Sequence, residues 1–144
     1  MGCQMLLGRS KGSRPQRGQS LAEFAVVAPV FLLVMMAMFN LAMAGFAAVS
    51  ASNAANYGAR RGSVVQGGGA AAVAAAAAQQ QAETFGVGEY EISAYGGGRR
   101  GAQVVVVVDW TVPNFIGGLM AYVGADLSND FSGSITSSFR QEGW

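Results

Sequence analysis

A run of 36 uncharged residues, from Phe24 to Ala59, constrains the fold of this 144-residue chain more than any other feature. Its first part, Phe24–Val49, is strongly apolar, and a bilayer core needs only about 20 such residues. The twelve Leu, Val and Phe side chains in that part contribute about −4 to −7 kcal/mol to membrane insertion. This gain outweighs the cost of Pro29 and Asn40, so we predict a transmembrane helix.

Basic residues predict the orientation of that helix. Residues 1–18 form a leader with no acidic residue and four basic ones, whereas only Arg60 and Arg61 follow closely after the run. The positive-inside rule therefore places the N-terminus in the cytoplasm and the rest of the chain outside it. An alternative is a cleaved secretory signal with its site at Ala42-Met43-Ala44, although the apolar region is longer than the 7–15 residues of such signals.

The composition argues against an enzyme. The chain has no histidine, which removes the usual general base and the commonest metal ligand, and Cys3 is its only cysteine. The acidic residues after the apolar run are scattered, so we predict no catalytic residues, no cofactor and no metal site. Arg99 and Arg100 have three acidic residues nearby at 83–91, so we predict no nucleic-acid partner either.

The remainder of the chain predicts a small α+β domain. Three glycines at 67–69 end the first helix, and the Ala-rich stretch 70–85 predicts a second helix that stops at Gly86. Alternation of apolar and polar residues predicts three strands, at 88–95, 103–112 and 131–139.

The second of these strands is apolar on both faces, which predicts the central position in the sheet. An apolar excursion at 115–123 is compatible with a short helix over the sheet. The predicted fold is thus α+β: a long N-terminal transmembrane helix, a second Ala-rich helix and a small three-stranded antiparallel sheet. We divide the chain into a leader (1–18), a transmembrane and assembly helix (19–62) and an extracytoplasmic α+β domain (63–144).

Small residues recur at steps of four and three along the end of the first helix and form a small-residue stripe: Ala44, Ala48, Ala51, Ala55, Gly58 and Gly62. Such a stripe lets helices approach closely. Because 12 of the 19 residues from 44 to 62 are Ala, Gly or Ser, a stripe of this kind also arises readily by chance. It permits close helix packing without demonstrating it.

The junction between leader and helix carries the most specific signal. Gly18 is followed five residues later by Glu23, a lone carboxylate at the edge of the apolar run. An acidic residue there is costly unless paired. The junction resembles that of type IV prepilins, which are cut after the glycine, and such a cut would place the new amine of Gln19 about one helical turn away. An amine–carboxylate pair, within one chain or between neighbours, would relieve both groups. Alternatively, Glu23 is a plain interfacial residue that marks the helix start.

This junction resembles the cleavage and assembly motif of type IV prepilins, in which a membrane-embedded aspartyl peptidase cuts after the glycine. The stretch from Arg17 to about Val64 is similar to TadE-like and TadG-like proteins of the tight-adherence (Flp) pilus system. Three features carry the likeness: the pair Glu23-Phe24, Pro29 a few residues into the span, and the segment Tyr57–Arg61. The chain's size favours the TadE-like branch.

The resemblance implies a minor pseudopilin that is cut between Gly18 and Gln19 by a prepilin peptidase and is needed to assemble an adhesive pilus. Glu23 and Phe24 would act in assembly, and Pro29 would kink the helix. The implied partners are the prepilin peptidase, other pilins and pseudopilins, the inner-membrane assembly platform and membrane lipid. The alternative is an uncleaved, single-pass membrane protein with an extracytoplasmic binding or scaffold domain.

Overall fold

The computed structural model describes residues 17–84, 86–121, 124–125 and 129–142. The chain divides into two compact units, one up to Val34 and the other from Met35 onward. Helix α1 (Arg17–Ser63) runs through the division. Most of the predicted leader lies outside the described residues, but its last two residues, Arg17 and Gly18, belong to α1.

In the first unit the described chain is the beginning of α1. Its apolar side chains are largely exposed, as at Leu21 (72%) and Phe24 (70%). Helix α1 is long and apolar enough to cross a membrane. Among the described residues this is one N-terminal helix that could span a bilayer, consistent with a single-pass membrane protein.

The second unit contains the rest of α1, α2 (Ala70–Glu83), α3 (Gly117–Ala121) and three strands. Strands β1 (Glu89–Gly96), β2 (Gln103–Val112) and β3 (Phe131–Arg140) form one antiparallel sheet in the order β1-β2-β3. Ile92 pairs with Val108, which pairs with Ile135 across the sheet. The predicted α+β fold, with its central second strand, is confirmed.

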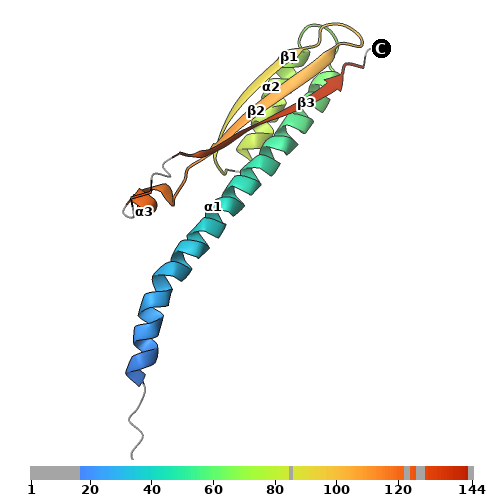
Figure 1. Ribbon diagram of the computed structural model, residues 1–144. Helices are drawn as coiled ribbons and strands as arrows, with labels where there is room; N and C mark the ends of the chain where they lie inside the picture. The colour runs from blue at the N-terminus through green and yellow to red at the C-terminus, as the bar shows by residue number, and fades with distance from the viewer. Residues whose placement is uncertain (1–16, 85, 122–123, 126–128, 143–144) are drawn as a thin grey trace, which may run out of the picture. The chain divides into compact units, whose positions relative to one another are not determined.

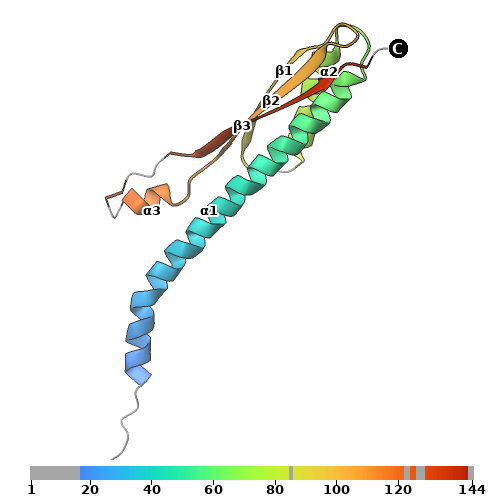
Figure 2. The ribbon, with the colours of Figure 1, turned by 45° about the vertical axis from the view of Figure 1, so that its right-hand side comes forward.

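One face of the sheet is covered by α2 and by the end of α1, as Figures 1 and 2 both show. The valines of β2 that point to this face are fully buried, because strand residues alternate between the two faces. They meet a face of α2 whose buried residues are all alanine: Ala70, Ala74, Ala78 and Ala82. The core is therefore built from methyl groups and valines.

The last two residues of the small-residue stripe, Gly58 and Gly62, pack against α2 in the same chain. A Cβ atom added at Gly58 would lie 2.6 Å from the carbonyl oxygen of Ala74 and 2.7 Å from Cβ of Ala78. One added at Gly62 would lie 2.7 Å from Cβ of Ala74. These separations are shorter than ordinary van der Waals contact, so the close approach of α1 and α2 requires glycine at both positions.

The predicted elements differ from the observed ones mainly at their ends. Helix α2 ends at Glu83, with Thr84 as its C-cap, and Gly86 follows with a φ of +58°. The apolar excursion contains α3, which spans only residues 117–121, while residues 122–123 lie outside the described residues.

Candidate functional site

The predicted processing bond joins two residues of the first turn of α1, Gly18 and Gln19. The first N–H groups of a helix have no intrahelical carbonyl partner, so a terminal turn opens more easily than an internal one. A protease needs its substrate extended. Cleavage here would therefore require this turn to unwind.

Glu23 and Phe24 follow one turn later, and both side chains are exposed. The helix places Glu23 four residues after Gln19, which is the spacing of neighbours on one helix face. The geometry is thus suited to the pair between the Gln19 amine and the Glu23 carboxylate, because a cut after Gly18 would create that amine at this position. The pair itself stays a prediction.

Pro29 lies inside α1, and helical residues continue on both sides of it. Its ring removes the backbone N–H that would bond to the carbonyl of Ala25, which weakens the helix locally. The kink expected at this position stays a prediction.

Side-chain burial divides α1 into two parts. From Ser20 to Phe39 every side chain is exposed or only partly covered, and we call this part the uncovered span. From Asn40 onward, buried positions recur every three or four residues as α1 packs on the rest of its unit. An uncovered apolar helix surface of this extent is suited to lipid or to the helices of other subunits.

The covered part begins with a hydrogen bond between two distant asparagines. Asn40, only 1% exposed, donates from Nδ2 to Oδ1 of Asn114 at 2.8 Å. The same Asn114 oxygen accepts the backbone N–H of Ile116 at 3.1 Å, and the backbone N–H of Asn114 donates to Oδ1 of Asp130 at 3.1 Å. Asn114 thus ties α1, the segment before α3 and the approach to β3 together.

Sequence reasoning did not identify this contact. Asn40 is the one polar side chain in Phe24–Val49, and hydropathy alone counts it only as a cost to membrane insertion. A lone polar residue in an apolar helix does indicate a contact with another polar group, because a buried amide needs a hydrogen-bonding partner. The partner could not be named from the sequence, since Asn114 is 74 residues away.

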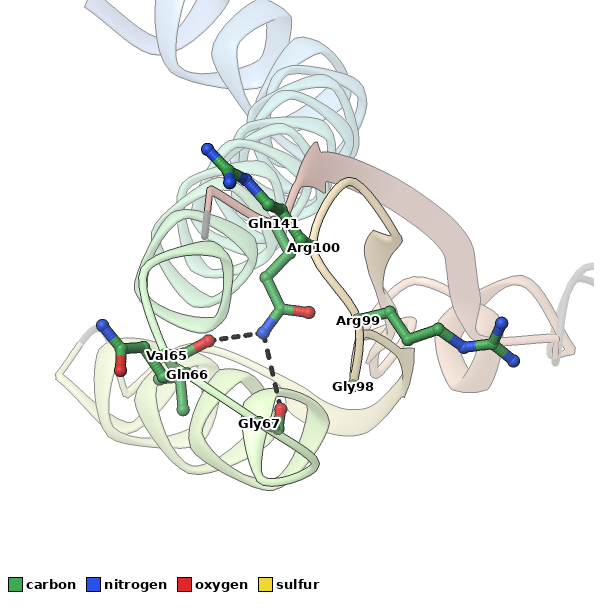
Figure 3. Close-up of a pocket in the computed structure, with 7 residues that line it drawn as sticks. All are labelled: Val65, Gln66, Gly67, Gly98, Arg99, Arg100 and Gln141. Atoms are coloured by element: carbon green, nitrogen blue, oxygen red, sulfur yellow. Dashed lines mark hydrogen bonds between the residues drawn. The ribbon is translucent and has the colours of Figure 1, made fainter. Parts of the chain in front are cut away.

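A small cavity of about 160 Å³ lies at the other end of the unit, between the α1–α2 connection and the β1–β2 hairpin (Figure 3). Gln141, which is 4% exposed, donates from Nε2 to the carbonyl oxygens of Val65 and Gly67. The guanidinium groups of Arg99 and Arg100 point away from its amide. The cavity is therefore lined by three loops held together by Gln141, and its lining contains no group of residues suited to catalysis.

Comparison with known families identifies the first part of the chain. Residues 18–60 match the TadE-like protein family. The match confirms the resemblance and suggests association with the tight-adherence pilus system. It includes all five predicted site residues, from Gly18 to Pro29, and the whole uncovered span. Comparison of the chain with curated proteins and with solved structures gives no match.

The TadE-like segment stops within α1, before α2 and the sheet. The match therefore concerns the first part of the chain, which includes the uncovered span. No family match covers α2 or the sheet, so the fold of the α+β part rests on the structure alone.

Proposed function

We propose that this chain is a minor pseudopilin, cut by a prepilin peptidase between Gly18 and Gln19 and required for assembly of a tight-adherence pilus that contributes to surface adhesion. The observation that carries the proposal is the TadE-like match over residues 18–60. The matched residues include the whole uncovered span and, at the start of α1, Gly18 and Glu23.

The uncovered span supports a role in assembly. Its large apolar side chains are exposed, so they can pack on lipid before assembly and on the apolar helices of other pilins afterwards. The inner-membrane assembly platform would take the subunit from the membrane with its N-terminus cytoplasmic. Glu23 would pair with the amine of Gln19 and set the axial position of one subunit against the next.

The α+β part supports a minor rather than a bulk subunit. A chain that served only as a filament helix would not need the part after α1, which holds more than half of the residues. We propose a structural role for this part, without catalysis, cofactor or metal. Its place outside the cytoplasm follows from the basic leader.

The decisive experiment is the intact mass of the full-length protein extracted from membranes with and without an active prepilin peptidase. We expect loss of residues 1–18 and Gln19 as the first residue when the peptidase is active. Gly18→Val should block the cut, because a branched side chain obstructs the scissile bond. Gly45→Val is the matched control, since Gly45 is an exposed residue of α1 with no atom within 4 Å of an added Cβ.

Retention of Met1 or Gly2 in cells with an active peptidase would instead favour the second candidate, an uncleaved membrane-anchored scaffold protein. A cleaved secretory signal predicts a third result, a cut near Ala44. The structure disfavours that cut, because it would remove Asn40 and with it the hydrogen bond to Asn114.

A further inference from the structure

We propose that the segment Asn114–Ala121, which leads into and contains α3, docks on the outer surface of the same bilayer that α1 crosses. Its partner is therefore lipid. The inference requires α1 to span a membrane, but it does not depend on cleavage, on a pilus or on any other part of the proposed function.

The length of the uncovered span locates the edge of the bilayer. Ser20–Phe39 contains 20 residues, which as an α-helix extend for about 30 Å. The hydrocarbon core of a bilayer is also about 30 Å thick. Asn40, the next residue, is the first that the rest of the chain buries. For a helix that crosses close to the membrane normal, the outer edge of the hydrocarbon therefore falls near Asn40.

The asparagine contact brings the α3 segment to that level. Asn40 bonds directly to the side chain of Asn114, and Asn114 in turn holds the backbone N–H of Ile116. The N–H of Gly117 donates to the carbonyl of Asn114 at 3.3 Å, and that of Met120 donates to Ile116 at 2.9 Å. A short series of hydrogen bonds thus fixes the first turn of α3 beside the residue at which α1 leaves the membrane.

The composition of the segment suits an interface with lipid. Residues 113–121 (PNFIGGLMA) contain no charged residue. Phe115 is 50% exposed, and Ile116 and Met120 are partly exposed. None of these three belongs to the hydrophobic core formed by the helices and the sheet. Aromatic and apolar side chains at this depth gain free energy by entering the boundary between headgroups and acyl chains.

A lipid partner accounts for these observations better than a protein partner does. The exposed apolar side chains occur where the unit comes closest to the end of the membrane helix. The carboxylate of Asp130, the nearest described acidic group, bonds to the backbone N–H of Asn114. At the opposite end of the unit, beside Arg99, Arg100 and Arg140, the exposed surface is charged.

The proposal can be tested by placing spin labels in the full-length chain. Cys3 is the only cysteine, so a Cys3→Ser background accepts single cysteines. Phe115→Cys is the test position. Phe31→Cys, in the uncovered span, is the lipid control, and Ser138→Cys, an exposed residue near the far end of β3, is the aqueous control. The three labelled positions are exposed, so folding should be preserved.

Each labelled protein is reconstituted into phosphatidylethanolamine–phosphatidylglycerol vesicles, and its accessibility to oxygen and to a water-soluble nickel chelate is measured. We expect the oxygen-to-nickel ratio at position 115 to be severalfold higher than at 138 and to approach the ratio at 31. A ratio at 115 equal to that at 138, with 31 in lipid, would overturn the proposal. An aqueous signal at 31 would overturn it too, because α1 would not span the bilayer.

Discussion

The contact between α1 and α2 predicts that a single methyl group at Gly58 destabilises the second unit. In Gly58→Ala the new Cβ would lie 2.6 Å from the carbonyl oxygen of Ala74 and 2.7 Å from Cβ of Ala78. Neither atom can rotate away, because one belongs to the backbone and the other is fixed to it. The helices must therefore separate by several tenths of an ångström, which typically costs about 1–3 kcal/mol in a packed core.

A matched substitution isolates this cost. Replacing glycine by alanine inside a helix gains up to about 1 kcal/mol in helix propensity, which partly offsets the clash at Gly58. Gly45→Ala has the same gain without a clash, since nothing lies within 4 Å of the added Cβ. The difference between the two variants therefore reports the steric cost alone, about 1–3 kcal/mol.

The assay is thermal unfolding of the two full-length variants in the same mild detergent, followed by tryptophan fluorescence. For a unit of about 100 residues, 1 kcal/mol corresponds to roughly 4–8 °C in Tm. Gly58→Ala should therefore melt at least about 4 °C below Gly45→Ala. If Gly58→Ala were as stable as Gly45→Ala, the close approach of α1 and α2 would be refuted.

Three further predictions concern single side chains. Glu23→Ala should leave cleavage intact but reduce piliation, counted by electron microscopy; normal piliation would remove the case for the amine–carboxylate pair. Asn40→Ala should lower the stability of the second unit by about 1–3 kcal/mol, because it breaks a buried hydrogen bond; Asn53→Ala, at an exposed position of α1, should change Tm little, and equal shifts would contradict this assignment. Gly133→Ala should displace the Trp110 ring, since its Cβ would lie 2.7 Å from Cζ2, and an unchanged near-ultraviolet circular dichroism spectrum would argue against that contact.

Much of the architecture could be predicted because it depends on local periodicity. The two-residue period of 103–112 indicated β2 with its true bounds, and its apolar character on both faces indicated the central position. The glycines at 67–69 marked the break between α1 and α2 correctly. The end of α2 was less predictable, since Thr84 caps it through its hydroxyl, which donates to the carbonyl of Gln80 at 3.0 Å.

The membrane part of the candidate site was also accessible from the sequence. The roles predicted for Gly18, Glu23 and Pro29 depend on their spacing along one helix, and spacing can be read without a structure. The asparagine contact was not accessible in this way. It joins residues 74 positions apart, and only folding of the sheet onto α1 brings Asn114 to Asn40.

The sequence by itself determined that this chain has a helix long and apolar enough to span a membrane, with a basic stretch before it and a small α+β part after it. These properties follow from hydropathy, charge and periodicity, which act over short distances along the chain. The tertiary structure alone decided that Gly58 and Gly62 of the small-residue stripe pack on α2 of the same chain, and that α1 is uncovered for 20 residues before Asn40. The physical reason is that the burial of a side chain depends on which segments, distant in the sequence, pack against it. Those contacts form only when the whole unit folds.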